Sequence, residues 1–281
     1  IPAHVPLRAE DYARAMDGDL LDAALAEHRL FACDHGMLEG IEAGVTDGWR
    51  KFLYAPLSLY ALPPDRSTLR PVAIQCAQGP SPGPLFFPWQ GTAWRMARTV
   101  VQVSDSNLHG VVQHGVHTHL VMGLFAVCLH RSLARTHPLS VLLLPHLADT
   151  LNIDDLTRGL FASGGRTPTI QSVSERGTLA LAGWGYRTFD WTRDGVPERF
   201  AARGVTADAL PGYPARDDLE AHERVLRTFV HAYLRIYYGC DGDVAGDPEL
   251  ADFVRRREDR DEGGLRGGGE VATLDARETF V

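Results

Sequence analysis

The chain has 281 residues, of which 44% are hydrophobic, and a formal net charge of −8. This length is enough to bury a substantial core in one large domain or at most two. The acidic balance excludes a basic surface that could hold nucleic acid by charge, so no nucleic-acid partner is expected.

Four cysteines, Cys33, Cys76, Cys128 and Cys240, lie far apart without a C-x-x-C spacing, so neither a disulfide framework nor a zinc finger is expected. The longest apolar stretches are too short to span a bilayer, and no transmembrane segment is predicted. Peripheral contact with a membrane surface stays open. The N-terminus shows no signal-peptide pattern, and localisation is left unassigned.

The first third of the chain predicts one helix followed by a β-hairpin. Residues 20–30 carry apolar side chains at helical intervals. Residues 68–75 are β-branched and bounded by turn-forming residues, which predicts a strand paired with residues 57–62. Residues 79–88 contain too many prolines to be anything but a loop.

The middle of the chain predicts long helices. Residues 94–133 contain no proline and show an apolar helical stripe, which indicates one or two long helices. The stripe ends at His137-Pro138, because the residue before a proline disfavours the α conformation. The apolar run at residues 139–147 predicts a further buried helix.

Beyond residue 166 the sequence predicts irregular segments, one long helix and a terminal loop. Residues 167–172 and 184–191 are expected to be irregular or briefly extended, and residues 217–238 to form a long helix. The buried stripe of that helix is expected to be Leu219, Val225, Leu226, Phe229, Ala232, Tyr233 and Ile236. From about residue 251 a frayed loop is expected, so the overall class is mainly α with minor β.

Histidine clustering is the strongest chemical signal, with five of the twelve histidines between His109 and His130. His109, His114 and His119 are spaced by five residues, which leaves neighbours about 140° out of register on a regular α-helix. A π-bulge would bring such a pair onto one face. Imidazole binds several transition metals, so an irregular metal-binding helix is predicted. The alternative is that each histidine is a hydrogen-bonded core residue.

A longer pattern in one register resembles the lipoxygenase family. Its residues are Trp94, Ala97, Arg98, Asp105, His109, His114, Thr118, His119, Arg131, Leu133, His137, Pro138, Leu142, Leu143, Pro145 and His146. The resemblance implies a lipoxygenase-like helical domain with a long π-distorted metal helix and minor β-hairpins, truncated at both ends. Residues 1–281 are expected to be a partial catalytic domain of this type.

The resemblance also implies one non-haem iron per domain. His114 and His119 match two of the iron ligands, while His109, His137 and His146 match histidines that support the ligands or the fold. A third histidine, a nearby asparagine or histidine and a terminal isoleucine carboxylate would complete the site, and none of them is found before Val281. No catalytic residue is expected beyond the metal site.

The implied reaction removes a hydrogen atom from the 1,4-pentadiene of a polyunsaturated fatty acid, after which dioxygen adds to give a hydroperoxide. Ile153, Thr157 and Phe161 match positions that line the fatty-acid pocket, although Thr157 stands where alanine or glycine is usual. Gly110 and Gly123 replace a glutamine and a glutamate of the family pattern, and both changes are expected to remove polar support from the metal site.

Two alternatives remain at this point. The chain could be a non-catalytic lipoxygenase-like relic or lipid-binding fragment, which the missing ligands favour. It could also be an unrelated helical protein whose histidines bind zinc or haem, against which the non-histidine matches count.

Overall fold

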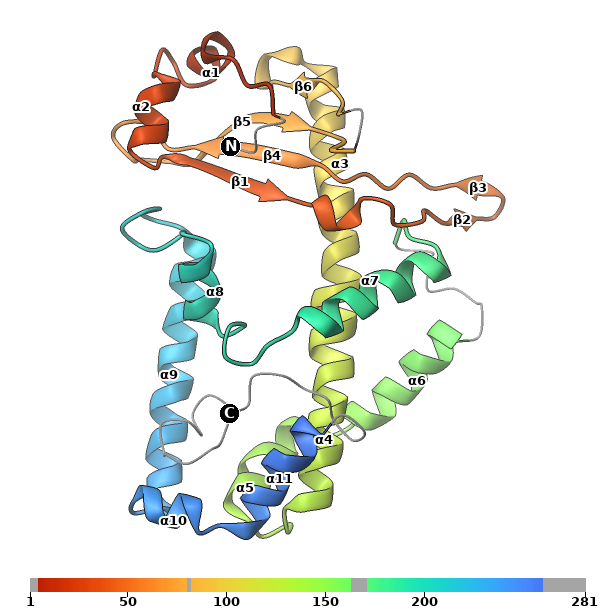
Figure 1. The fold of residues 1–281 in the computed structure, drawn as a ribbon, viewed down its shortest axis with the longest axis vertical. Coiled ribbons are helices and arrows are strands. Elements are labelled where there is room, and N and C mark those ends of the chain that lie inside the picture. The colour runs from red at the N-terminus through yellow and green to blue at the C-terminus, as the bar shows by residue number, and fades with distance from the viewer. Residues whose placement is uncertain (1–4, 80–81, 163–170, 260–281) are drawn as a thin grey trace. The chain divides into compact units, whose positions relative to one another are not determined.

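The computed structural model describes residues 5–79, 82–162 and 171–259, without the side chains of residues 157–162. The described part is mainly helical with a small amount of β-structure, which confirms the predicted class (Figure 1). The chain divides into two compact units, which are treated separately. The first comprises Ile1–Val112, Gly164–Gly183 and Val205–Tyr213, and the second comprises Gln113–Ser163, Trp184–Gly204 and Pro214–Val281.

The first unit is built on a four-stranded antiparallel sheet with the order β1-β4-β5-β6. The predicted hairpin is confirmed, since β4 pairs with β5 from Leu57–Gln75 to Ala61–Arg70. Leu57 and Leu59 of β4 pack in one core with Tyr12. The elements are α1 (Ala9–Ala15), α2 (Leu21–Ala26), β1 (Leu30–Asp34), a 3-10 turn η1 (Gly36–Leu38), β2 (Val45–Thr46), β3 (Trp49–Arg50), β4 (Leu57–Ala61), β5 (Arg70–Gln75), β6 (Leu85–Phe86), η2 (Pro88–Gln90) and α3 (Thr92–Leu108).

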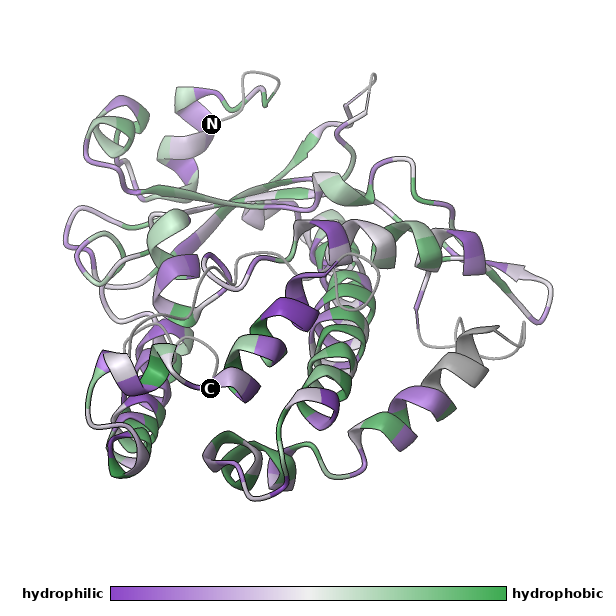
Figure 2. Ribbon diagram, turned by 60° about the horizontal axis from the view of Figure 1, so that its bottom comes forward, coloured by the Kyte–Doolittle hydropathy of each residue, from purple (hydrophilic) through white to green (hydrophobic). Residues whose placement is uncertain are grey.

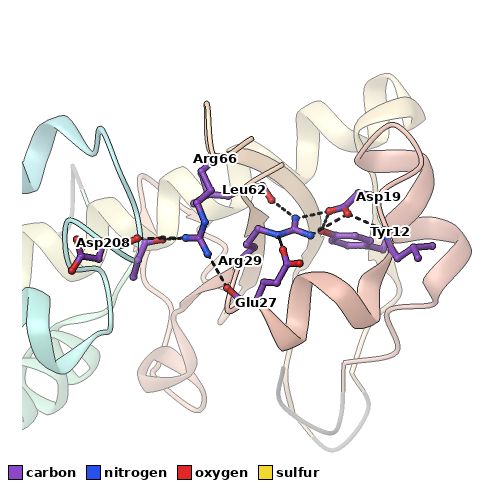
Figure 3. A network of polar contacts seen from close by, with 9 residues as sticks. Tyr12, Asp19, Glu27, Arg29, Leu62, Arg66 and Asp208 are labelled. Carbon is purple, nitrogen blue, oxygen red and sulfur yellow. Dashed lines mark hydrogen bonds and ion pairs between the residues drawn. The ribbon is translucent and has the colours of Figure 1, made fainter. Parts of the chain in front are cut away.

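A buried arginine links the helices of this unit to its sheet (Figure 3). Arg29 is 1% exposed, and its guanidinium donates to the carboxylates of Asp19 and Glu27 and to the backbone oxygen of Leu62. Tyr12 donates to the same Asp19 carboxylate. Each charge removed from water therefore has a hydrogen-bonded partner, as burial requires.

A single helical run joins α3, a π-helix at His109–Leu120 and α4 (Val121–Ser132). The π-helix confirms the irregularity predicted from the five-residue histidine spacing. The run, Thr92–Ser132, has 41 residues and is long and apolar enough by composition to cross a membrane. The core helix of a soluble protein meets the same criterion, so the expected lack of a membrane span stays a prediction.

In the second unit the core lies between α4, α9 and α11, where Phe125, Leu129, Leu234 and Phe253 are at most 2% exposed. Figure 2 shows α4 largely in the colours of apolar residues. The elements that follow α4 are α5 (Pro138–Leu143), η4 (Leu144–His146), α6 (Thr150–Ala162), α7 (Glu175–Thr188), α8 (Val196–Ala202), α9 (Pro214–Tyr237), α10 (Asp241–Ala245) and α11 (Pro248–Glu258), with α7 beginning in the first unit.

Three expectations for the second half of the chain were wrong. Residues 184–188 are helical as the end of α7, and residues 251–258 belong to α11. Helix α9 forms where it was predicted, but its proposed stripe is not buried: Val225, Leu226 and Ile236 are each more than 60% exposed. The buried positions of α9 are Arg216, Val230 and Leu234.

Candidate metal centre

The π-helix brings His114 and His119 together. Their Nε2 atoms are 3.2 Å apart, and their ring planes meet at 70° with centroids 4.8 Å apart. A π-helix hydrogen-bonds residue i to residue i+5, so two residues five positions apart lie one above the other. On a regular α-helix the same two rings would point in different directions.

Asp154 of α6 fixes one of the two rings. Its Oδ1 lies 2.8 Å from Nδ1 of His119, and its side chain is 3% exposed. An ionised carboxylate only accepts hydrogen bonds, so the proton of this contact lies on Nδ1 of His119. Sequence reasoning missed Asp154, because no spacing rule connects an aspartate to a histidine 35 positions earlier.

The pair fits one edge of a metal site. Two imidazole nitrogens at 3.2 Å would each reach one ion at ~2.1 Å, with roughly 100° between the bonds. Among the described residues no group of three or more His, Cys, Asp or Glu side chains could hold a metal ion. The described part of the chain therefore offers two imidazole donors, which suit iron but do not by themselves complete its coordination.

The sequence predicted that three further histidines support the ligands or the fold, namely His137, His109 and His146. His137 is 8% exposed: its Nδ1 accepts the backbone N–H of Leu139 at the start of α5, and its Nε2 lies 2.9 Å from Asp247. Tyr238 donates to the same Asp247 carboxylate. His109 and His146 are exposed. His137 thus joins α5 to α11, and its described contacts do not include the His114–His119 pair.

His117 matches no ligand position of the family pattern. Its ring packs 5.1 Å from the ring of Phe189, and burial lowers its pKa. It contributes to the wall of a separate pocket of about 520 Å³ that also contains Phe189, Trp191 and Asp194.

A smaller pocket of about 250 Å³ borders the candidate centre. Its lining is mostly apolar and comprises Leu120, Gly123, Leu124, Val127, Leu151, Asp154 and Tyr186. Ile153, one of the three predicted fatty-acid contacts, is 46% exposed. The side chains of Thr157 and Phe161 lie outside the described residues, so the predicted pocket lining stays a prediction.

The two glycine departures do not leave unfilled space. A Cβ on Gly123 would lie 2.2 Å from Oδ2 of Asp154, and a Cβ on Gly110 would lie 2.0 Å from the side-chain nitrogen of Gln171. A carboxylate and an amide from other helices and loops thus lie where the family pattern has glutamate and glutamine. The prediction that Gly123 removes polar support from the metal site was therefore wrong, because the carboxylate of Asp154 hydrogen-bonds to His119 there.

Comparisons with known proteins all match this chain to lipoxygenases. The lipoxygenase family model matches residues 2–268. The chain is 39% identical over 97% of its length to the linoleate 9/13-lipoxygenase of Pseudomonas aeruginosa, and 34% identical over 100% to the polyunsaturated fatty acid lipoxygenase ALOX8 of Mus musculus. It spans 40% and 42% of those proteins.

Solved structures agree with the sequence matches. The whole chain superposes on 42% of a calcium-dependent 11R-lipoxygenase with a TM-score of 0.89 at 27% identity. The predicted fold class is therefore confirmed.

Proposed function

The chain belongs to the lipoxygenase family, and from that premise we propose that it forms part of a catalytic domain that adds dioxygen to polyunsaturated fatty acids. The observation that carries this proposal is the approach of His114 and His119 to 3.2 Å between their Nε2 atoms. The names of its relatives, which include a linoleate and a polyunsaturated fatty acid lipoxygenase, support the substrate class.

His114 and His119 are proposed as two ligands of one non-haem iron, with further ligands contributed from outside this pair. Bound iron would supply the one-electron exchange that removes a hydrogen atom from a 1,4-pentadiene, so that dioxygen can add to the carbon radical. The two imidazoles bind as neutral groups, so they add no charge to the site. His109, His137 and His146 are proposed to support the ligands or the fold, and the contacts of His137 with Leu139 and Asp247 favour a role in the fold.

The apolar pocket beside His119 supports the proposal that this part of the chain binds an acyl chain and excludes water from it. Leu120, Leu124, Val127 and Leu151 present hydrocarbon to it. An acyl chain is favourably buried against such a wall, at roughly 25 cal/mol for each Å² removed from water. Ile153, Thr157 and Phe161 are proposed to extend this contact along α6.

Iron content and product formation test the proposal together. The purified chain, His114→Ala and His119→Ala are reconstituted with ferrous iron, and conjugated-diene absorbance is followed with linoleate under air. Both variants are expected to lose iron and product. His130→Ala, an exposed histidine beyond the π-helix, is the control and should retain both. Equal iron content in all four proteins contradicts the assignment of the pair.

A non-catalytic, lipid-binding role is the second candidate, favoured by the lack of a third donor at the pair among the described residues. It predicts that the chain binds a fluorescent fatty acid without forming hydroperoxide or retaining iron. Diene formation that depends on His114 and His119 would exclude it.

A further inference from the structure

The carboxylate of Asp154 is buried, and burying a charged group costs free energy. It is 3% exposed and forms part of the wall of the mostly apolar pocket beside Leu120, Leu124 and Val127. A buried carboxylate is stable only where it is hydrogen-bonded, and a hydrogen bond to an ionised group is stronger than a neutral one. The 2.8 Å contact with Nδ1 of His119 is one of the bonds that serve this need.

Gly123 leaves room for that carboxylate. A Cβ at position 123 would lie 2.2 Å from Oδ2 and 3.4 Å from Cγ of Asp154. The first distance is too short for any side chain, so even alanine would force Asp154 to move. Gly123 lies in the first turn of α4, one turn after His119, and thus on the part of the helix that faces α6.

We propose that Asp154 is a positioning residue for His119, which keeps the ring in the tautomer and orientation that direct Nε2 toward His114, and that Gly123 maintains the space this requires. A neutral imidazole has one nitrogen that donates and one that accepts, and the partner of one nitrogen decides the state of the other. With Asp154 at Nδ1, the lone pair of Nε2 is available to a metal. Only the metal-binding part of this inference rests on the proposed function.

The tautomer is measured without metal or substrate. The full chain is labelled with ¹⁵N-histidine, and long-range proton–nitrogen spectra identify the protonated nitrogen of each ring. The His119 signal is assigned by its loss in His119→Gln. It is expected to report a proton on Nδ1 in the unmodified chain and in Asp154→Asn, whose side-chain oxygen still accepts. In Asp154→Ala the proton should shift to Nε2 or be shared between both nitrogens.

Two further variants separate positioning from folding. Asp155→Ala removes the exposed neighbouring carboxylate on α6 and should leave the His119 signal unchanged. Gly123→Ala keeps Asp154 but crowds it, and should change the signal as Asp154→Ala does. A His119 tautomer that is the same in Asp154→Ala and Gly123→Ala, with native circular dichroism, would overturn the proposal.

Metal affinity gives the second readout. Cobalt(II) is titrated as a spectroscopic substitute for ferrous iron, and Asp154→Ala is expected to bind it 10–100-fold more weakly than Asp155→Ala does, the usual effect of removing a carboxylate behind a ligating histidine. Equal affinities would overturn the metal-binding part. If the unmodified chain binds no cobalt, the proposed metal pair fails, while the tautomer measurement still decides the role of Asp154.

Discussion

Arg29 and Asp19 form a two-pronged ion pair inside the first unit. Nη1 of Arg29 lies 2.6 Å from Oδ2 of Asp19, and Nη2 lies 3.1 Å from Oδ1 (Figure 3). Both side chains are removed from water, with exposures of 1% and 7%. The parallel arrangement of two N–H groups and two oxygens gives this pair a fixed geometry that a lysine could not reproduce.

Removal of Arg29 should destabilise the fold strongly. Arg29→Ala is expected to lower the free energy of unfolding by about 3–5 kcal/mol, because it leaves a buried carboxylate without its cation. Arg70 is the matched control, since its ion pair with Asp17 is 44% and 79% exposed. Arg70→Ala should cost about 0–1 kcal/mol. Urea denaturation followed by circular dichroism measures both, and equal losses would contradict the difference in burial.

Stability should depend on pH through Asp19. Hydrogen bonds from Arg29 hold its pKa below the ordinary range, against the opposing effect of burial. The unfolded chain has the higher pKa, about 3.9, and therefore binds more protons as the pH falls through this region. The stabilisation is complete above that pH and is lost as the pH falls toward the lower folded value.

Asp19→Asn tests this dependence. Its deficit in unfolding free energy, relative to the unmodified chain, should be constant from pH 7 to about 5 and shrink below about 4. A deficit that stays constant down to pH 3 would show that the carboxylate has an unshifted pKa. Chemical denaturation at each pH gives the measurement.

Gly177 should tolerate no side chain, although it lies within α7. A Cβ at this position would lie 2.4 Å from the backbone oxygen of Glu42. Alanine usually stabilises a helix relative to glycine by about 1 kcal/mol, but here it would displace the chain at Glu42, and a net loss of stability is expected. Gly242→Ala in α10 is the control, since its nearest neighbour is Sγ of Cys240 at 3.5 Å. A higher melting temperature for Gly177→Ala would contradict the close approach.

Substitutions on the two faces of α9 should change stability by different amounts. Phe229 is 56% exposed, so Phe229→Ser is expected to change stability by no more than ~0.5 kcal/mol. Leu234 is 1% exposed and packs in the core of the second unit, so Leu234→Ala should cost about 2–5 kcal/mol. Thermal melts of the two variants distinguish the faces. A large loss of stability in Phe229→Ser would indicate that Phe229 is buried, as the sequence predicted.

The sequence allowed some features to be predicted because they are local. The spacing of His114 and His119 was sufficient to predict a π-distorted helix, and β-branched residues between turn formers predicted β5. Such patterns depend on geometry within a few residues. The helical ends of α7 and α11 were missed because aromatic, glycine-rich or charge-dense stretches have no clear periodicity.

Other features depend on contacts that no local pattern contains. The apolar stripe of α9 predicted a helix correctly, but periodicity does not say which neighbour covers which face, and Val230 rather than Val225 is buried. Asp154 could be connected to His119 only after the π-helix and α6 had been placed together. From the sequence, Gly123 was expected to remove a polar group from the metal site. The polar group that lies beside it, the carboxylate of Asp154, comes from another helix.

The π-helix also constrains how this segment can change in length. Removing one residue between His114 and His119 would leave a pair spaced by four, which an ordinary α-helix already stacks on one face. His119 and Gly123 both follow such a deletion, so they keep their four-residue spacing and stay on the same face of the helix. If the shortened segment formed an ordinary α-helix, the pair and the contact of Asp154 with His119 could both be kept. If it stayed π-helical, His119 and Gly123 would move together relative to His114. The five-residue spacing is therefore what requires the π-helix, and the carboxylate of Asp154 adds no further requirement on the length of this segment.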